Sequence, residues 1–150
     1  MPDRTRILAV VAGRLVCAVP LSHVVETMRP LPIENFAAAP SFVLGLSRIR
    51  GLATPVVDLR ALLGTSTTGE ITRFASLRVG ARQVALAVDR VLGVRALGSA
   101  HCDDLPALLS GATGDVVEAI AELDQELLLV LRAGHLCPEA ALQALAAVSA

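Results

Sequence analysis

The sequence predicts a mainly β fold with two small β-barrels side by side, and three of its features support this prediction. The apolar residues come in short segments that are separated by glycine, proline and polar turn residues. A hairpin followed by a further pair of strands occurs twice along the chain in the same order. The chain has 150 residues and is 54% hydrophobic, which suits one domain with a core of its own.

We therefore expect a single domain over residues 4–147. Each barrel is expected to come approximately from one half of the chain, with the two halves intertwined across a shared core. Aromatic residues make up only 2% of the chain, so this core must be built from Leu, Val, Ile and Ala.

Two hairpins are predicted in the first half of the chain, each around a turn that contains glycine. The first has strands over residues 7–12 and 15–19, and the second has strands over residues 43–49 and 52–58. Pro55 lies inside the last of these strands. Because proline has no N–H to donate to a neighbouring strand, an edge or a bulge is expected there.

The segments around these hairpins are predicted from their turn and capping residues. Residues 20–28 are expected to form a short helical turn with Ser22 as its N-cap. Residues 29–41 contain several prolines and are expected to form an irregular connector. Residues 58–63 are expected to form a brief helix that ends at Gly64.

The second half of the chain repeats this pattern. Strands are expected over residues 74–79, 83–88, 91–97, 116–123 and 127–132. A long loop is expected over residues 98–114, with one helical turn at residues 105–109. A C-terminal helix is expected to begin at Pro138, because apolar residues recur there at helical spacing.

A weak internal duplication supports the repeated architecture. A shift of 74 residues (123 − 49 = 74) places Ile49 on Leu123 and Val56 on Val130. Only some of the aligned positions keep their character. The repeated order of hairpin and strand pair is therefore the stronger argument for two similar units.

Charge and composition exclude several classes of function. The formal net charge is −1, which provides no field to attract a nucleic acid or an anionic membrane surface. The chain has three Phe and no Trp or Tyr, so it lacks the aromatic platforms on which unpaired bases stack. No apolar run is long enough to insert into a bilayer. The first residues do not resemble a signal peptide, and three widely spaced cysteines form no disulfide framework, so a cytoplasmic location is expected.

Two segments resemble sites of chemistry, and both have simpler interpretations. Residues 64–71 have the glycine spacing of a phosphate-binding loop, but Glu70 stands where that loop requires lysine, which favours a solvated linker. His101, Cys102, Asp103 and Asp104 are four adjacent metal-ligand types with no partner motif elsewhere, which favours a turn over a zinc site.

The remaining candidates for catalysis are also better explained by structure. Cys17 lies in the middle of a predicted strand and is expected to be a small core residue. His23 is expected to be a partly buried structural histidine. Glu118, Glu122 and Glu126 share one outward face unless the turn at Asp124 breaks their register. No catalytic residue, cofactor or metal is therefore expected, and the apolar surplus instead suggests docking surfaces at strand edges or grooves.

Residues 42–59, F-V-L-G-L-S-R-I-R-G-L-A-T-P-V-V-D-L, carry the most specific motif in the chain. They resemble the signature of the CheW family, which reads roughly F-V-x-G-V-x-N-L-R-G-x-x-x-P-V-x-D-L. The direct matches are Gly45, Arg50, Gly51, Pro55, Val56, Asp58 and Leu59. Residues 87–94 are similar to the V-D-x-V-x-G-V stretch of the family, and the similarity extends over about residues 7–145.

This resemblance implies a fold of two five-stranded, SH3-like Greek-key barrels with short helices and a C-terminal helix. It implies a non-enzymatic adaptor in bacterial chemotaxis signal transduction. The expected partners are the regulatory domain of a CheA-type histidine kinase and the signalling hairpin of a chemoreceptor, which would lie in the groove between the barrels. The adaptor is expected in the cytoplasm, recruited to receptor arrays at the membrane.

The resemblance also implies a set of binding residues. By position, Val24, Glu26 and Arg50 belong to the binding region, and Arg48 adds a charge where the family usually has asparagine. Gly45, Gly51, Pro55, Asp58 and Leu59 are expected to be structural residues of the motif. Ala119 and Gln125 replace expected glycines, and Arg132 replaces a usual aspartate.

Arg50 precedes a turn glycine, so its long side chain is expected to project from the end of a strand pair. Arginines at interfaces are frequent hot spots of binding energy. We predict that Glu26 pairs with Arg50 across neighbouring segments and holds the guanidinium in position. The alternative is two unrelated exposed charges.

Two other functions remain open. The first is an adaptor of the same family for a non-flagellar pathway, such as twitching motility or another kinase pathway, which the departures at Arg48 and the last hairpin favour. The second is a metal-dependent or hydrolytic enzyme centred on His101, Cys102 and Asp103.

Overall fold

The computed structural model describes residues 6–35, 40–65, 69–97, 101–104 and 116–136, and for residues 101–104 it describes the backbone alone. In these residues β-strands dominate, as the sequence predicts. The strands are β1 (Arg6–Ala12), β2 (Leu15–Pro20), β3 (Val24–Met28), β4 (Val43–Ile49), β5 (Leu52–Asp58), β6 (Arg73–Val79), β7 (Arg82–Val88), β8 (Arg90–Ala96), β9 (His101–Asp104), β10 (Val117–Leu123) and β11 (Glu126–Leu131). The short helices are η1 (Leu21–His23), α1 (Leu59–Leu63) and η3 (Ala133–His135).

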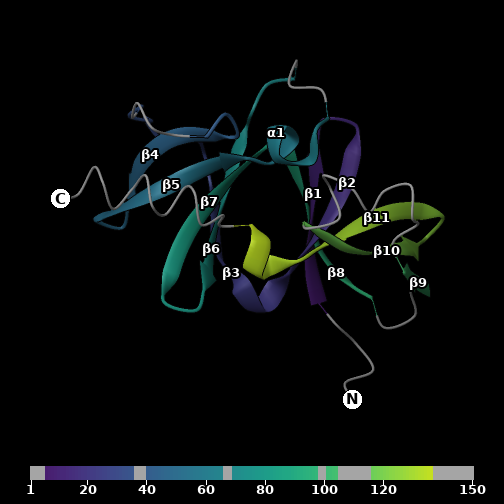
Figure 1. The fold of residues 1–150 in the computed structure, drawn as a ribbon. Helices are drawn as coiled ribbons and strands as arrows, with labels where there is room; N and C mark the ends of the chain where they lie inside the picture. The colour runs from purple at the N-terminus through teal and green to yellow at the C-terminus, as the bar shows by residue number, and fades with distance from the viewer. Residues whose placement is uncertain (1–5, 36–39, 66–68, 98–100, 105–115, 137–150) are drawn as a thin grey trace.

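The strands form two sheets that lie side by side, with α1 placed between them (Figure 1). The first sheet has the order β3-β6-β7-β5-β4 and is called barrel 1. The second has the order β8-β1-β2-β11-β10-β9 and is called barrel 2. The prediction of a mainly β fold with two barrels is confirmed.

The assignment of one barrel to each half of the chain is wrong. Barrel 1 uses the continuous segment β3 to β7, whereas barrel 2 combines β1 and β2 from the start of the chain with β8 to β11 from its end. Because β11 pairs with β2 in parallel, strands from the end of the chain join strands from its start in one sheet. The equivalent parallel pairing in barrel 1 joins β5 to β7.

The two barrels repeat one design in register. The bounds of β10 follow those of β4 at the shift of 74 residues seen in the sequence. The hairpin β6–β7 follows β1–β2 at a shift of 67 residues (73 − 6 = 67). The parallel pair Val56↔Ala85 in barrel 1 corresponds to Val130↔Ala18 in barrel 2. The duplication is therefore visible in the backbone pairing, although few side chains are alike at equivalent positions.

Two local predictions were wrong. The helical turn expected over residues 20–28 ends at His23, and Ser22 makes no cap, because Pro20 occupies the N-cap position and no side chain caps the turn. The β-branched residues that follow form β3 instead, as such residues favour extended backbone. The long loop expected over residues 98–114 contains β9, which pairs with β10. The helical turn at residues 105–109 and the C-terminal helix lie outside the described residues.

Pro55 lies in an inner strand, with β4 on one side of β5 and β7 on the other. Pairing of β5 with β7 begins only at Val56, one residue later. On that side Pro55 therefore has no partner to which an N–H would be donated, so it is tolerated as it would be at an edge.

One central core joins the barrels. Its largest cluster combines residues of barrel 2 such as Val10 and Val19 with residues of barrel 1 such as Leu77 and Leu86. Leu59 and Leu63 of α1 pack into the same cluster. Burial of this apolar surface, at about 25 cal/mol per Å², fixes the two barrels relative to each other.

Candidate protein-binding site

The two edges of barrel 1 are brought together by the connector that follows β3. In the sheet order, β3 and β4 are opposite edges. Residues 29–35 run back along β4, where Glu34 and Leu46 exchange two backbone hydrogen bonds of 2.8 Å. The hydroxyl of Ser47 donates to the carbonyl oxygen of Pro32 at 2.8 Å. The edge of β4 is thus paired, and the sheet closes on itself.

Gly45 makes this closure possible. Its φ of 146° is one that residues with a side chain rarely adopt. A Cβ at this position would lie 2.7 Å from Cγ2 of Ile33 and would overlap the carbonyl oxygen of Glu34. The expectation of a structural role for Gly45 is consistent with this close approach of the connector.

The turn between β4 and β5 presents Arg50 to solvent. Arg50 and Gly51 both have left-handed backbone, with φ of 53° and 79°. Two such residues in succession match the right-handed twist of a two-residue hairpin. The turn directs the Arg50 side chain outward, and 75% of that side chain is exposed.

Glu26 and Arg50 form a bidentate ion pair, as predicted. Nε of Arg50 donates to Oε2 of Glu26 at 2.9 Å, and Nη2 donates to Oε1 at 3.0 Å. The hydrogen bond from Arg50 lowers the pKa of Glu26, and the same bond raises the pKa of Arg50. Because Glu26 lies on β3 and Arg50 follows β4, the pair bridges the seam where barrel 1 closes.

The other two expected binding residues, Val24 and Arg48, take no part in this ion pair. Val24 is half-buried and packs against the central core, whereas its neighbour Val25 is 52% exposed. Arg48 is exposed on the outer face of β4, opposite Ala53. Arg48 and Ala53, together with Leu31 and Leu46, line a hollow of about 220 Å³.

Asp58 and Leu59 of the sequence motif are structural. Asp58 is the N-cap of α1 and accepts hydrogen bonds from the backbone N–H groups of Arg60 at 3.0 Å and Ala61 at 3.5 Å. Leu59 is fully buried in the central core. At the other end of α1, Gly64 ends the helix with a φ of 75°, as predicted.

Arg60 is a structural residue that sequence reasoning missed. It is only 5% exposed, and its Nε and Nη2 donate to the carboxylate of Asp58 at 3.1 and 3.2 Å. The Arg60 guanidinium also donates to the carbonyl oxygen of Gly69 and lies 3.8 Å from Asp89. Asp89 in turn accepts from the N–H of Gly13 in the β1–β2 turn at 2.8 Å.

This network connects barrel 1 to barrel 2 through a buried charge. The hydrogen bond to Asp58 raises the pKa of Arg60. No sequence pattern predicts this buried network, because the burial of Arg60 follows from the packing of α1 between the sheets.

The residues weighed for catalysis have structural roles where they are described. Cys17 is buried, and burial raises the pKa of its thiol to about 12, so it is a core residue rather than a nucleophile. Nδ1 of His23 lies 3.2 Å from the carbonyl oxygen of Arg78, which ties η1 to β6. Among the described residues, no group of three His, Cys, Asp or Glu side chains could hold a metal ion. The side chains of residues 101–104 lie outside that description.

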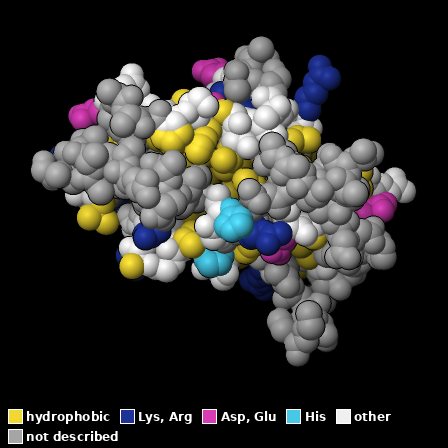
Figure 2. Space-filling view, viewed as in Figure 1, with side chains coloured by type: hydrophobic (Ala, Val, Ile, Leu, Met, Phe, Trp, Pro, Cys, Tyr) yellow, Lys and Arg dark blue, Asp and Glu magenta, His cyan; other side chains and the backbone are white. Residues whose placement is uncertain are grey.

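Apolar side chains reach the surface in several places. In one view they lie over the middle of the molecule, with histidine and arginine side chains beside them (Figure 2). Exposed examples are Val25, Ile33, Leu52, Val94 and Leu127. Within the described residues there is no helix with the length and apolar character needed to cross a membrane.

Comparison with known proteins gives consistent results. The model of the CheW-like domain family matches residues 6–141. Protein FrzA of Myxococcus xanthus is 34% identical over 101 residues, which cover 66% of this chain and 62% of FrzA. Chemotaxis protein CheW of Helicobacter pylori is 23% identical over 117 residues, which cover 77% of this chain and 70% of that protein.

The fold has a counterpart among solved structures. The scaffolding protein TtCheW of Thermoanaerobacter tengcongensis superimposes with a TM-score of 0.75 at 21% identity. The superposition covers 86% of this chain and 89% of TtCheW. With the family match over nearly the whole sequence, these findings show that the chain belongs to the CheW-like domain family.

Proposed function

We propose that the chain is a non-enzymatic adaptor that couples chemoreceptors to a CheA-type histidine kinase. Its partners are the regulatory domain of the kinase and the signalling hairpin of the receptor, and it acts in the cytoplasm at receptor arrays. Membership of the CheW-like domain family supports this role. So do relatives that are named a chemotaxis protein and a scaffolding protein.

The observation that carries the proposal is the Glu26–Arg50 pair. An arginine that is 75% exposed would ordinarily sample many rotamers, but the two hydrogen bonds to Glu26 restrain its guanidinium. A restrained donor loses less conformational entropy when a partner binds. Arginines placed in this way are frequent hot spots at protein interfaces.

The environment of this pair suits a protein partner. Val25, which is 52% exposed, neighbours Glu26, and Leu52, which is also 52% exposed, follows the Arg50 turn. A charged group next to exposed apolar side chains is the usual composition of an interface core and its rim.

The test is a binding titration with a purified kinase regulatory domain and a receptor signalling fragment. Replacement of Arg50 by Ala is expected to weaken binding of at least one partner by about tenfold or more. Arg14→Ala is the matched control, since Arg14 also lies exposed in a hairpin turn, in barrel 2. Equal affinities for both variants, or binding of the wild type to neither partner, would contradict the proposal.

A second candidate is an adaptor of the same family in a non-flagellar kinase pathway. FrzA, which does not carry the chemotaxis name, is 34% identical to this chain, compared with 23% for the Helicobacter chemotaxis protein. Arg48, which stands where the family usually has asparagine, is exposed and lines a hollow, where it can alter the choice of partner. Capture of the cognate kinase from the native organism distinguishes the two pathways.

A further inference from the structure

The chain crosses between the two barrels twice. In the first crossing, η1 joins β2 of barrel 2 to β3 of barrel 1. In the second, Asp89 alone joins β7 of barrel 1 to β8 of barrel 2. The two crossings are equivalent in the repeated design, since each follows the second strand of a hairpin and leads into the other barrel. A rotation of one barrel against the other must take place about these two points.

Asp89 is the centre of a set of hydrogen bonds at the second crossing. Its backbone N–H donates to the carbonyl oxygen of Val11 at 2.9 Å, and its Oδ1 accepts from the N–H of Gly13 at 2.8 Å. Both of these bonds are to barrel 2. On the side of barrel 1, the hydroxyl of Thr72 donates to the carbonyl oxygen of Asp89, and Nη1 of Arg60 lies 3.8 Å from its Oδ2. The Asp89 side chain therefore connects both barrels.

Neutralisation of Arg60 does not explain the burial of Asp89. The Asp58 carboxylate already accepts from Nε and Nη2 of Arg60, at 3.1 and 3.2 Å. Asp89, whose side chain is only 14% exposed, adds a second carboxylate to a site with one cation. A buried charge without a full partner of its own lowers stability. The carboxylate must therefore have another role, and its contacts indicate the connection between the barrels.

The surroundings of Asp89 hold its carboxylate in one orientation. Oδ1 is bonded to barrel 2 and Oδ2 faces Arg60, so rotation of the carboxylate would disturb both contacts. The Arg60 guanidinium is itself fixed, because it also donates to the carbonyl oxygen of Gly69. A Cβ on Gly69 would overlap the Asp89 carboxylate, so the backbone before β6 packs directly against the network.

The first crossing has no comparable network among the described residues. Its side-chain hydrogen bond joins Nδ1 of His23 to the carbonyl oxygen of Arg78 at 3.2 Å, and this bond is exposed. No residue of η1 is buried. Water readily replaces a single exposed hydrogen bond, so the angle between the barrels is not determined here.

The shared core holds the barrels together but does not by itself select one angle. Its buried members are Leu, Val and Ala side chains with Cys17, and none of them is aromatic. Burial of apolar surface is non-directional, and aliphatic cores of the right volume lose a unique arrangement before they lose stability. Small rotations therefore remain open to the core. A buried, directional polar network can exclude them.

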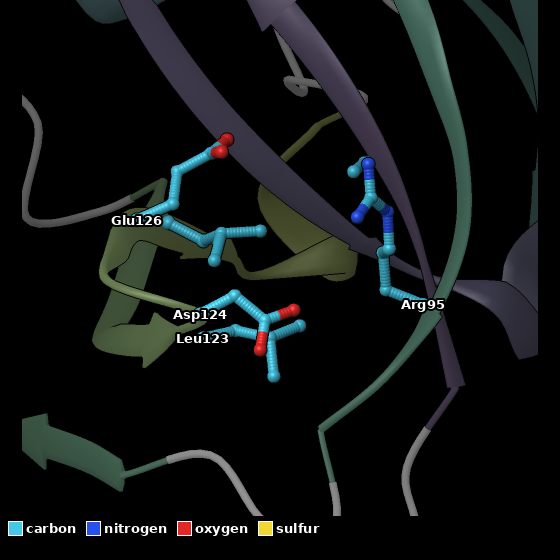
Figure 3. A pocket seen from close by; sticks show the side chains of 6 residues that line it. Arg95, Leu123, Asp124 and Glu126 are labelled. Carbon is cyan, nitrogen blue, oxygen red and sulfur yellow. The ribbon is translucent and has the colours of Figure 1, made fainter.

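Another group of charges, in barrel 2, cannot have this role. Asp124 and Glu126 lie across from Arg95 of β8 around a hollow of about 20 Å³ (Figure 3). All three residues are exposed, and no ion pair joins them within the part of the chain that the structure describes. They also belong to one barrel, so they do not connect it to the other.

We propose that Asp89 is a positioning residue that fixes the angle between the two barrels, by linking the Asp58–Arg60 pair of barrel 1 to the β1–β2 turn of barrel 2. Val24 and Glu26 follow directly after the first crossing, so this angle also determines how these residues are placed relative to barrel 2. A partner that contacts both barrels therefore meets one arrangement of the surface. The role of Asp89 does not depend on a kinase or a receptor.

The experiment measures residual dipolar couplings of the backbone N–H groups in a weakly aligned sample of the full chain. The couplings of each barrel are fitted separately, which gives one alignment tensor for each barrel. The two tensors of the wild type are expected to coincide. Asp89→Ala removes both side-chain links and leaves the Asp58–Arg60 pair in place. In this variant the common tensor is expected to be lost, because motion of one barrel averages its couplings.

Asp89→Asn keeps an oxygen for the N–H of Gly13 but removes the charge that faces Arg60. It is expected to give a smaller difference between the tensors, and it remains informative if Asp89→Ala does not fold. Arg95→Ala is the control for loss of an exposed charge and is expected to retain the common tensor.

Two further controls separate the angle from stability and from the other crossing. Leu128→Ala lowers stability within a cluster that belongs to barrel 2 alone. His23→Ala removes the exposed bond at the first crossing. Both variants are expected to retain the common tensor.

A common tensor in every Asp89 variant that folds overturns the proposal, because the apolar core then fixes the angle alone. Different tensors in the wild type also overturn it. So does a difference in Leu128→Ala, His23→Ala or Arg95→Ala as large as that in Asp89→Ala, since the angle would then not depend on Asp89 in particular.

Discussion

Barrel 1 and barrel 2 share a backbone design but differ in the charges that they present. Their hairpins, parallel pairings and bulges coincide at fixed sequence shifts. At the tips, Arg48 and Arg50 in barrel 1 correspond to Glu122 and Asp124 in barrel 2. The geometry of each hairpin depends on backbone pairing and turn conformation, so exposed side chains can diverge without cost to the fold. Binding specificity is therefore expected to depend on these exposed side chains.

A second difference follows each hairpin. The backbone N–H of Asp58 donates to the carbonyl oxygen of Phe42 at 2.8 Å, and the N–H of the equivalent Arg132 donates to Val116 at 2.6 Å. The chain path is thus the same in both barrels. In barrel 1 the Asp58 carboxylate caps α1 and neutralises Arg60, whereas in barrel 2 the arginine is followed by the shorter helix η3.

The largest expected effect is the loss of Asp58. Asp58→Ala removes the N-cap of α1 and leaves the buried Arg60 without its main partner, so we expect the free energy of unfolding to fall by about 3 kcal/mol. Arg132→Ala, at the equivalent exposed position, is expected to change it by less than about 0.5 kcal/mol. Urea denaturation measures both values.

Asp58→Asn separates the two roles of the carboxylate. Asparagine caps helices as well as aspartate does, so any remaining loss of stability reports the charge interaction with Arg60. Equal destabilisation by Asp58→Ala and Arg132→Ala would contradict this difference between the two barrels.

A smaller effect is expected at the bulge that both barrels share. Gly45→Ala forces a Cβ against the connector at a φ of 146°, and we expect it to destabilise the protein by about 2 kcal/mol. The equivalent position in barrel 2 is Ala119, which already carries a Cβ. Ala119→Gly is therefore expected to lower stability by less than about 1 kcal/mol in the same denaturation assay. The reverse order of the two effects would contradict the close approach at Gly45.

The smallest effect concerns the pH dependence of the Glu26–Arg50 pair. The hydrogen bond from Arg50 lowers the pKa of Glu26. The pair therefore stabilises the fold at pH values above the ordinary pKa of a glutamate carboxyl. That contribution is lost as the pH falls through the lowered pKa. In a side-chain carboxyl NMR titration, Arg50→Ala is expected to move the Glu26 midpoint upward, and Arg14→Ala is expected to leave it in place. An unchanged midpoint in Arg50→Ala would show that the pair is absent in solution.

Much of the fold could be predicted because it depends on local patterns. The strands over residues 43–49 and 52–58 and the turn between them were predicted with correct bounds, since short apolar segments on either side of a turn glycine define them. The segment that became β3 was misassigned because a proline and a serine suggested a helix. The exchange of β1 and β2 into barrel 2 was missed because long-range pairing leaves no local signal.

The candidate site was predictable only in part. The Glu26–Arg50 pair was anticipated from a motif position and a projecting turn. Arg60, Val25 and Leu52 were not singled out, because their burial or exposure depends on how β3, α1 and the two sheets pack. The same residue type can be buried at one position and exposed at another, and tertiary contacts decide its burial.

We propose that the cation at position 50, held by Glu26, is what a partner of barrel 1 recognises. The most direct measurement is the affinity of the kinase regulatory domain and the receptor fragment for the double variant Glu26→Arg/Arg50→Asp. This variant can keep an ion pair across the seam but gives the turn the charge that barrel 2 has at Asp124. We expect an unchanged unfolding midpoint and binding weakened by about tenfold or more for at least one partner. Affinities for both partners within about twofold of the wild type would contradict it.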